Sequence, residues 1–406
     1  MEYYIIELGN GIRGVLKQVK SPVVYSAITI GAGSCDENSD EFGAAHFMEH
    51  MFFKGTKKRR QYHINSLLDN VGGELNAYTT KEETVVHSSV LKKDFLKAVD
   101  LMSDVVFNSM VDAKELEKER EVIIDEINSY KDSPSELIFD NFEDLIFEGT
   151  SLGHPILGSR SSLKKITSST LHNFTKRCYS SDKIIFSVIG NISPLRFQQT
   201  MERYFSSIAS SSQNYDRQKA TIYTPKHIEK KLSTHQCHML MGTTAYTHTD
   251  SRRLSLLFLT NMLGGQSPSS LLNQELREKR GLTYNVECNF NSFENNGLFS
   301  IYFSCDKEKR SLCNDLIEKE IKKLQKGAIS EHALSRFKKQ LIGQIAIASD
   351  NNENLMLSSA RSLLTFGEID SFNTIQTRIE QISSSDILDI SNEIMDLNNF
   401  STLTYL

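Results

Sequence analysis

The sequence lacks several features that would place the protein in a well-defined class. No stretch of the 406 residues approaches the ~18 consecutive apolar residues of a membrane-spanning helix. Basic charge is not in excess, because 46 Lys and Arg face 51 Asp and Glu and the formal net charge is -5. These absences predict a protein that neither crosses a membrane nor binds nucleic acid through its bulk charge.

The cysteines follow no pairing pattern, and the N-terminal segment does not resemble a signal peptide. The six cysteines are scattered and form no C-x-x-C pair, which favours reduced, buried thiols over a disulfide framework. The N-terminal segment 1–8 has no basic region and no long apolar region, so we interpret it as a strand and not as a signal peptide. We therefore expect a cytoplasmic protein, or a mature organellar form that has been trimmed.

The residues that are present indicate a globular protein with mixed secondary structure. The composition is 39% hydrophobic and 24% charged, which is typical of soluble domains, and the length suits two or three of them. A β-branched run predicts a strand at 23–30, and extended segments predict strands at 74–79, 84–91 and 184–189; helical spacing predicts helices at 42–53, 93–108 and 113–131. A serine-rich stretch at 206–224 is the clearest candidate linker, and Gly153-His154-Pro155 is interpreted as a loop.

Two stretches recur in the same order in the two halves of the chain. Gly31-Ala32-Gly33 and the helical pattern after it match Gly242-Thr243-Thr244 and its following helix, at a separation of 211 residues. A second match, at a separation of 218 residues, relates 115–137 to 333–355. Such a repeat indicates that the two halves of the chain have the same fold. We therefore expect an α+β protein of two tandem homologous α/β-sandwich domains, 1–212 and 213–406, each a mainly antiparallel sheet packed with helices.

The sharpest motif is His46-Phe47-Met48-Glu49-His50, within the helix predicted at 42–53. Residues four apart in a helix lie on one face, so His46 and His50 have the spacing with which two imidazoles bind one zinc ion. Glu49 lies beside the second histidine and can act on water at the metal without being a ligand. A helix with two ordinary histidines is the alternative interpretation.

Two carboxylates in the helix predicted at 113–131 favour the metal. Glu119 and Glu126 share its apolar stripe, whereas most of its other carboxylates fall elsewhere. Carboxylates on a core-facing stripe cost free energy unless a cation or a hydrogen bond compensates them. With Glu126 as third ligand, the site would be His2Glu with a fourth position open for water, which is the catalytic pattern. The alternative is that the apolar stripe of this helix is narrower and does not include the two glutamates.

The second half of the chain lacks all of these groups. At separations of 211 and 218 residues, their positions are occupied by Leu257, Thr260, Asn261, Phe337 and Gln344. This loss is expected when one half keeps a metal and the other half keeps only the fold.

These motifs resemble the pitrilysin/insulinase family of zinc metallopeptidases, whose inverted zincin motif is HxxEH. The 76 positions from His50 to Glu126 match the family's spacing to its distal glutamate. The stretches 42–56 and 72–79 resemble the processing-peptidase branch, as do Leu263-Gly264-Gly265 and 276–284 in the second half. The resemblance covers the whole chain, in order.

The resemblance implies a role for each matching residue of the first half. His46, His50 and Glu126 would bind Zn2+, and Glu49 would be the general base that activates the water. Glu119 would orient a ligand or the water without touching the metal.

The resemblance also implies a substrate site. Asn76 and Ala77 would lie on an exposed edge strand that pairs with the substrate backbone. Arg277 and Tyr284 would close the site from the second domain, with Tyr284 near the developing oxyanion. Without the resemblance, Arg277 would be interpreted as part of a solvated helix end and Tyr284 as a core residue.

We therefore expect a zinc metalloendopeptidase that hydrolyses short or unfolded peptides, bound in extended form by strand addition. One alternative is a non-catalytic structural or binding subunit of the same fold. Another is the catalytic subunit of a heterodimeric presequence-processing peptidase. Larger relatives close a chamber with four such domains, so this chain would form half of a clamshell. We expect a homodimer, and a heterodimer with a degenerate homologue is the alternative.

Overall fold

The computed structural model describes residues 3–212, 217, 223–232, 234–327 and 329–406. The chain forms two compact units, each drawn from both halves of the sequence. Unit 1 joins Met1–Asn128, His154–Arg217 and Ala348–Ile369, and unit 2 joins Ser129–Gly153, Gln218–Ile347 and Asp370–Leu406. The expected domains, 1–212 and 213–406, are contiguous, so they differ from these units by two exchanged segments and stay a prediction. The linker expected at 206–224 lies partly outside the described residues.

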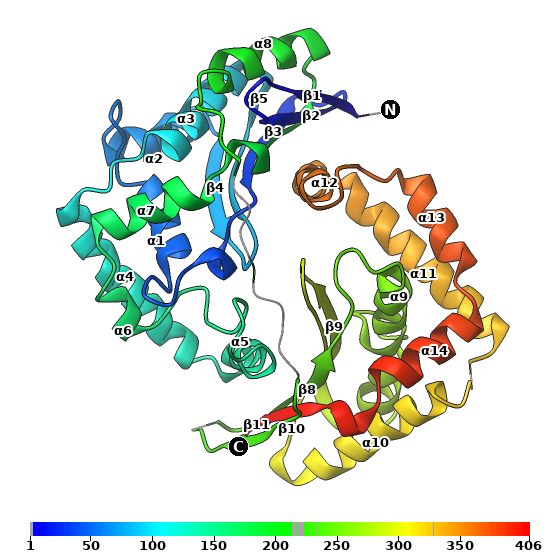
Figure 1. The fold of residues 1–406 in the computed structure, drawn as a ribbon. Helices are drawn as coiled ribbons and strands as arrows, with labels where there is room; N and C mark the ends of the chain where they lie inside the picture. The colour runs from blue at the N-terminus through cyan, green and yellow to red at the C-terminus, as the bar shows by residue number, and fades with distance from the viewer. Residues whose placement is uncertain (1–2, 213–216, 218–222, 233, 328) are drawn as a thin grey trace. The chain divides into compact units, whose positions relative to one another are not determined.

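Unit 1 is built on a six-stranded sheet with the order β1-β2-β6-β3-β5-β4 (Figure 1). Only β2 and β6 run parallel to each other. The strands are β1 (Tyr4–Glu7), β2 (Arg13–Gln18), β3 (Val23–Ile30), β4 (Glu74–Thr79), β5 (Thr84–Leu91) and β6 (Ile184–Gly190). The helices are α1 (Ala44–Phe52), α2 (Gln61–Asp69), α3 (Phe95–Phe107), α4 (Ala113–Lys131), α6 (Arg160–Leu163), α7 (Ser168–Cys178), α8 (Pro194–Phe205) and α12 (Asn352–Phe366), with short 3-10 helices η1 (Ser34–Asp36), η2 (Lys92–Asp94) and η3 (Ser181–Lys183).

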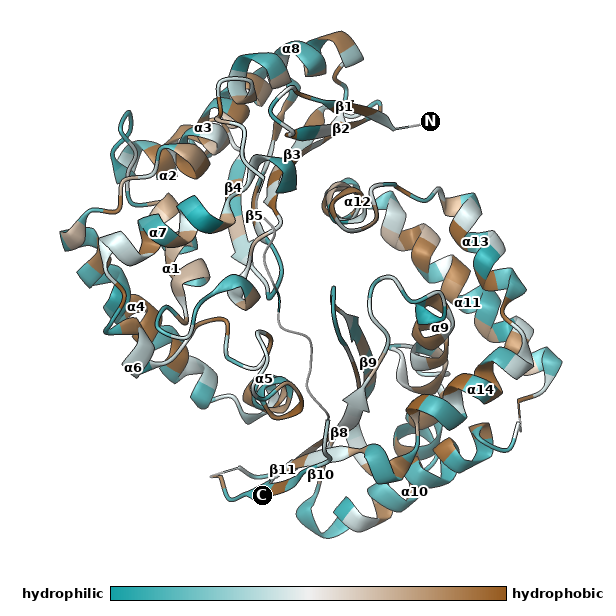
Figure 2. Cartoon of the chain, in the orientation of Figure 1, coloured by the Kyte–Doolittle hydropathy of each residue, from teal (hydrophilic) through white to brown (hydrophobic). Residues whose placement is uncertain are grey.

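The sheet of unit 1 is covered on both faces, and strand β6 shows this most clearly. Successive side chains of a strand point to opposite faces. Phe186 and Val188 join the large core that α1, α3, α7 and α8 cover. Ile185 and Ile189 join two small clusters with residues of α12. Hydrophobic and hydrophilic residues are interleaved along these helices (Figure 2), as expected for helices with one face on a core.

Helix α12 comes from the second half of the chain and covers one face of the sheet of unit 1. It packs on β6 and β3, and Figure 1 shows it in orange beside these strands. Met356 is fully buried there against Ala27, Val85 and Ile189. Its Arg361 also forms an ion pair with Glu83, the residue before β5.

Replacing Met356 by alanine should therefore destabilise unit 1. We expect the free energy of unfolding to fall by about 2–5 kcal/mol, the usual cost of removing a large buried side chain. Denaturant unfolding measures this loss, and Leu357→Ala, one residue further along α12 at a half-buried position, should cost clearly less. Equal losses for the two variants would contradict the packing of α12.

Unit 2 repeats the same plan with a five-stranded sheet of order β7-β11-β8-β10-β9. Here β7 and β11 form the parallel pair. The strands are β7 (His227–Lys230), β8 (Cys237–Thr244), β9 (Thr283–Ser292), β10 (Gly297–Cys305) and β11 (Ser401–Tyr405). The helices are α5 (Pro134–Ile146), α9 (Arg253–Gly264), α10 (Arg310–Leu324), α11 (Glu331–Asp350), α13 (Phe372–Gln381) and α14 (Ser384–Ile394), with the π-helix η4 (Asn273–Glu278) and 3-10 helices η5 (Lys307–Lys309) and η6 (Leu397–Asn399).

The repeat expected from the sequence reappears in the topology. Without β1, the strands β2-β6-β3-β5-β4 of the first sheet correspond one by one to β7-β11-β8-β10-β9 of the second. The parallel pair occupies the same place in both sheets, as β2 with β6 and as β7 with β11. Helix α5 packs on β8 and β11 just as α12 packs on β3 and β6. The separation of 218 residues relates the first residues of α4 and α11, and also those of α5 and α12. The glycine match is looser, because Gly242-Thr243-Thr244 ends β8 whereas Gly31-Ala32-Gly33 follows β3.

The expected α+β architecture, with two mainly antiparallel sheets packed with helices, is confirmed. All six cysteines are buried and none forms a disulfide, as their scattered positions predicted. Within the described ranges, none of the helices combines the length and the apolarity that crossing a bilayer requires.

Candidate metal centre

Helix α1 carries the two histidines on one face. It begins after Gly43 and buries Phe47 and Met51 completely in the core of unit 1. The rings of His46 and His50 follow one turn apart, with centroids 4.7 Å from each other. The apolar face of the helix thus fixes the direction in which both imidazoles point.

Helix α4 supplies the two carboxylates expected from its pattern. Leu116 and Ile123 are buried in the core, and Glu119 is only 5% exposed. Glu126 is half-buried, whereas Glu121 on another face of the helix is exposed. The predicted apolar stripe therefore contains both glutamates.

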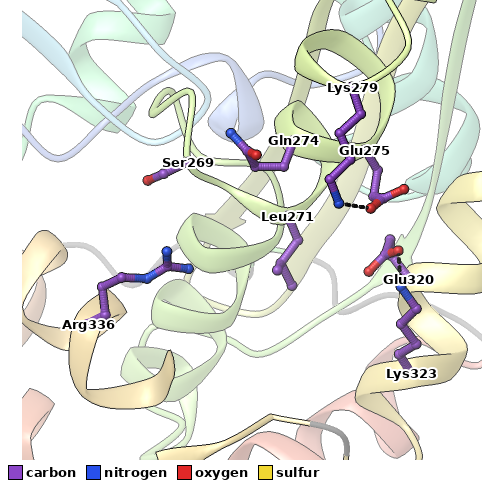
Figure 3. Close-up of a pocket in the computed structure, with 8 residues that line it drawn as sticks. All are labelled: Ser269, Leu271, Gln274, Glu275, Lys279, Glu320, Lys323 and Arg336. Atoms are coloured by element: carbon purple, nitrogen blue, oxygen red, sulfur yellow. Dashed lines mark hydrogen bonds and ion pairs between the residues drawn. The ribbon is translucent and has the colours of Figure 1, made fainter. Parts of the chain in front are cut away.

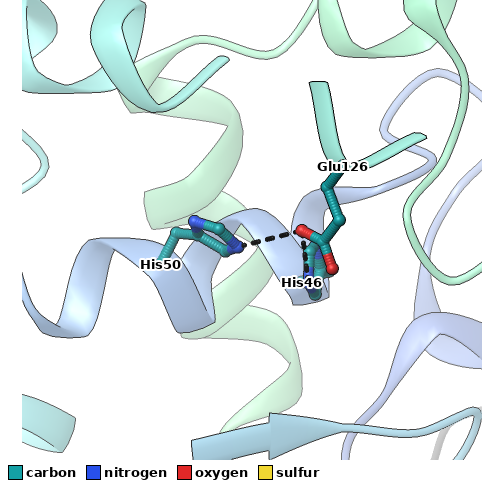
Figure 4. A group of neighbouring side chains, drawn as sticks. All are labelled: His46, His50 and Glu126. Carbon is teal, nitrogen blue, oxygen red and sulfur yellow. Dashed lines mark ion pairs between the residues drawn. The ribbon is translucent and has the colours of Figure 1, made fainter. Parts of the chain in front are cut away.

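Glu126 and the two histidines converge on one point (Figure 4). Glu126 Oε2 lies 3.7 Å from His46 Nε2 and 3.6 Å from His50 Nε2. One potential ligand atom from each residue lies within 4.8 Å of the others, and the described residues contain no second such group of His, Cys, Asp or Glu. Two imidazole nitrogens and one carboxylate oxygen are the donor set of a catalytic zinc site.

The pKa values of the three residues reflect burial and mutual contact. Burial lowers the pKa of His46 to about 4, which favours the neutral imidazole that a metal needs. Burial also opposes charge on His50, but the carboxylates of Glu126 and Glu119 outweigh it and raise the pKa of this histidine. The imidazole of His50, whose Nε2 lies 3.6 Å from Glu126 Oε2, lowers the pKa of Glu126. A bound cation would compete with protons for these groups.

Glu119 holds His50 from the side away from the ligand cluster. Its Oε2 accepts a hydrogen bond of 3.1 Å from His50 Nδ1, and its Oε1 forms an ion pair of 2.6 Å with Lys54 Nζ. Because Nδ1 donates to the carboxylate, the lone pair of Nε2 is left for a metal. The ammonium of Lys54 compensates the buried negative charge of Glu119.

Glu49 lies on the same helix and is held by the neighbouring strand. Its Oε2 accepts a hydrogen bond of 2.6 Å from Thr79 Oγ1, at the end of β4. Burial raises the pKa of Glu49 above its ordinary value, although the bond from Thr79 opposes this. Asn76 and Ala77 precede Thr79 on β4, which is the last strand of its sheet. Asn76 is exposed and Ala77 half-buried.

The two remaining candidates lie in unit 2. Arg277 is an exposed residue of η4 whose Nε lies 3.8 Å from Glu278 Oε1. Tyr284 lies on β9, the end strand of the second sheet, and is 86% exposed, so it is not a core residue. The roles of both residues stay predictions.

Two contacts of the candidate site were not predicted from the sequence. The pairing of Lys54 with Glu119 and that of Thr79 with Glu49 join residues that are far apart along the chain. The buried position predicted for Glu119 already required a compensating cation, and Lys54 stands four residues after His50. That spacing was the available signal for the first contact.

An open pocket of about 400 Å³ in unit 2 offers no comparable site (Figure 3). Two ion pairs line it, Lys279 with Glu275 and Lys323 with Glu320, each at 2.5 Å. Because these charges already satisfy one another, the pocket presents no group of convergent ligands.

Comparison with known proteins follows the two halves of the chain. The family described as Insulinase (Peptidase family M16) matches residues 15–160, and the Peptidase M16 inactive domain matches residues 165–341. An uncharacterized zinc protease of Bacillus subtilis, YmxG, is 31% identical over 377 residues, which cover 92% of this chain and 91% of that protein. A Rickettsia bellii protein, also named an uncharacterized zinc protease, is 31% identical over 97% of this chain and 95% of its own.

Solved structures show the same fold at lower identity. A protease from Helicobacter pylori superimposes with a TM-score of 0.91 at 18% identity, covering 100% of this chain and 99% of that chain. A peptidase M16 inactive domain from Pseudomonas fluorescens gives a TM-score of 0.91 at 15% identity, covering 100% and 98%. With matches in both halves and relatives aligned over nearly the whole length, the chain belongs to the insulinase family of peptidases, peptidase family M16.

Proposed function

We propose that the protein is a zinc-dependent endopeptidase that cleaves short or unfolded peptides. The observation that carries this proposal is the convergence of His46, His50 and Glu126 beside a fourth residue, Glu49, that is suited to be the base. The names of its relatives, which are zinc proteases, support the choice of metal.

The residues present fit a zinc ion. Three ligand atoms converge, one carboxylate oxygen lies nearly equidistant from two Nε2 atoms, and Glu119 fixes the tautomer of His50. A zinc ion bound by these groups would lower the pKa of its water toward neutrality and polarise the scissile carbonyl.

Glu49 supplies the proton transfer. Its raised pKa brings the carboxyl closer to the working pH, where a general base accepts a proton and later returns it to the leaving amine. Thr79 holds one carboxylate oxygen, which restricts rotation of the side chain and leaves the other oxygen for the water.

Strand β4 connects the base to the substrate. As the end strand of its sheet, it has backbone groups on one side that no neighbouring strand of that sheet satisfies. An extended peptide added there beside Asn76 and Ala77 would be held by the strand whose last residue, Thr79, positions Glu49. Folded proteins are poor substrates for this mode of binding, because they seldom expose an extended segment.

The finer features of the proposal rest on the family resemblance. Arg277 and Tyr284 would contact the substrate near the developing oxyanion. The protein would act as a homodimer, or as a heterodimer with a degenerate homologue, in the cytoplasm. Maturation of presequences and scavenging of peptides are both compatible with the site.

Metal content and peptide cleavage, measured on the same purified protein, test the proposal. We expect about one zinc per chain and cleavage of an unstructured peptide library, with the cuts mapped by mass spectrometry. A chain without bound zinc that cleaves nothing after zinc is added would instead be a non-catalytic subunit.

Glu119→Gln should weaken zinc binding without removing a ligand. The glutamine keeps the size of the side chain but loses the charge that holds His50 and Lys54. We expect the dissociation constant for zinc to rise about 10- to 100-fold, which is typical when a partner of a ligand is replaced. Competition with a chromophoric chelator measures it.

Glu121→Gln is the matched control for this change, because Glu121 is an exposed glutamate of the same helix. Its zinc affinity should equal that of the wild type. Identical affinities for the Glu119 and Glu121 variants would show that Glu119 does not support the metal.

A further inference from the structure

The loop interpreted from Gly153-His154-Pro155 does more than connect two helices. His154 is 4% exposed and stacks on Phe42, with ring centroids 3.9 Å apart and an interplanar angle of 15°. Its Nε2 lies 3.0 Å from the carbonyl oxygen of Ser34 and 3.2 Å from Glu37 Oε2. A loop residue that is this deeply buried, with two polar contacts, is held in one orientation.

Glu37 connects His154 to the start of the helix that carries the metal ligands. Its side chain is fully buried. Oε2 accepts a hydrogen bond of 2.8 Å from the backbone N–H of Gly43, and Oε1 accepts one of 2.7 Å from that of Ala45. A carboxylate here satisfies N–H groups that have no partner within the helix and lies at the positive end of its dipole. The next residue after Ala45 is the ligand His46.

The start of α1 is tightly constrained around this carboxylate. Gly43 has φ 97°, and a Cβ there would come within 2.9 Å of the carbonyl oxygen of Leu157, just beyond the His154 loop. These constraints fix both the first residue of α1 and the direction of its axis. A small shift of Glu37 would therefore move the start of α1.

The same loop also contacts the turn that follows β4, the strand whose Thr79 holds Glu49. Lys81 is buried, and its Nζ donates a hydrogen bond of 2.6 Å to the carbonyl oxygen of His154. Lys81 follows Thr79, the partner of Glu49, by two residues along the chain. His154 thus contacts Glu37, which caps the helix of the ligands, and Lys81, which follows Thr79, the partner of Glu49.

We propose that His154 is a positioning residue of the metal centre, acting through Glu37 on His46 and through Lys81 on Thr79. This inference rests on the proposed function, because it concerns the same site. It assigns His154 no contact with metal or substrate.

The bonding pattern explains why the residue is a histidine. Both partners of Nε2 are acceptors, so Nε2 must carry the proton. Nδ1 is buried and has no hydrogen-bond partner among the described residues, so the polar contacts of the ring are all made through Nε2. A planar ring with one donor fits between Phe42 and Glu37, whereas an aliphatic side chain would leave Glu37 without that donor.

Three variants of the full-length protein test the proposal. His154→Leu removes the donor, and His154→Gln places an amide N–H near the position of Nε2. His238→Leu in unit 2 is the matched control, because His238 is also buried and its Nδ1 lies 2.8 Å from the hydroxyl of Tyr302. For each variant we would measure amide hydrogen exchange of residues 43–47 without metal, zinc affinity, kcat and KM.

We expect His154→Leu to speed exchange at residues 43–47 at least about 10-fold and to weaken zinc binding about 10-fold. It should lower kcat with little change in KM, because His154 touches no substrate. His154→Gln should recover most of each loss, and His238→Leu should change none of them even if it lowers Tm. Equal behaviour of His154→Leu and His238→Leu would overturn the proposal.

Two further outcomes are distinguishable. A wild-type chain that binds no zinc would refute the proposed function, while the exchange rates of the metal-free protein would still decide whether His154 orders the start of α1. If His154→Leu does not fold, Glu37→Gln gives the same comparison. It keeps the size of the side chain and replaces the carboxylate that accepts from Gly43 and Ala45.

Discussion

Replacing Glu49 by glutamine is expected to leave zinc bound and to reduce kcat about 10²- to 10⁴-fold, the usual contribution of a general base. Glutamine has nearly the same shape, and its Oε1 can still accept the hydrogen bond from Thr79. The amide cannot accept the proton of the water, so the chemical step fails while the fold and the ligands persist. Metal analysis and peptide cleavage on one preparation would show both results.

Glu121→Gln controls for the loss of one negative charge in the same unit. It should cleave peptides at the wild-type rate, since Glu121 is exposed and lies outside the metal cluster. Undiminished cleavage by the Glu49 variant would remove this residue from the mechanism. Loss of zinc from the Glu49 variant would make it a ligand instead of a base.

Replacing His50 by alanine is expected to remove both the metal and the activity. The change deletes the Nε2 atom that lies 3.6 Å from Glu126 and leaves Glu119 without its imidazole partner. With two protein ligands in place of three, zinc content should fall from about one per chain to near none, and cleavage should reach background. Wild-type protein treated with a chelator should behave in the same way and recover when zinc is returned.

His172→Ala is the matched control for this variant, because His172 is an exposed helical histidine, on α7. It should retain zinc and activity. Full zinc content in His50→Ala would mean that the metal is bound elsewhere in the protein.

Much of the local structure could be predicted from the sequence, because the segments that form strands and helices have clear first and last residues. The strands at 74–79 and 84–91 and the helix at 113–131 have the bounds that the sequence predicted. A glycine pair, Gly72-Gly73, marks the start of the first strand, and the long charged helix has a three- to four-residue period. The weak repeat also predicted that two sheets would have one topology.

The exchange of helices between the units was not predictable in this way. The amphipathic patterns of α5 and α12 show that each helix has an apolar face, but not which sheet that face covers. Contiguous halves were the simplest expectation from a tandem repeat. The structure instead places Met356 of the second half against Ala27 and Ile189 of the first.

The residues of the candidate site also fall into two groups, those that the sequence could predict and those that it could not. His46, Glu49 and His50 share one helical turn, so their proximity follows from spacing alone. Glu126 followed from a carboxylate on an apolar stripe. Thr79 and Glu37 required contacts between distant segments, which a single sequence does not reveal, and for Lys54 the only signal was its position four residues after His50. Their roles became visible only when the hydrogen bonds around the site were known.

An anomalous difference map at the zinc absorption edge tests the central claim most directly. We predict one peak per chain, at about 2.0–2.2 Å from His46 Nε2, His50 Nε2 and a carboxylate oxygen of Glu126, in crystals of the active protein. Glu49 should approach this peak without coordinating it. A zinc peak elsewhere in the active protein, or full activity with no peak at these three residues, would contradict the account.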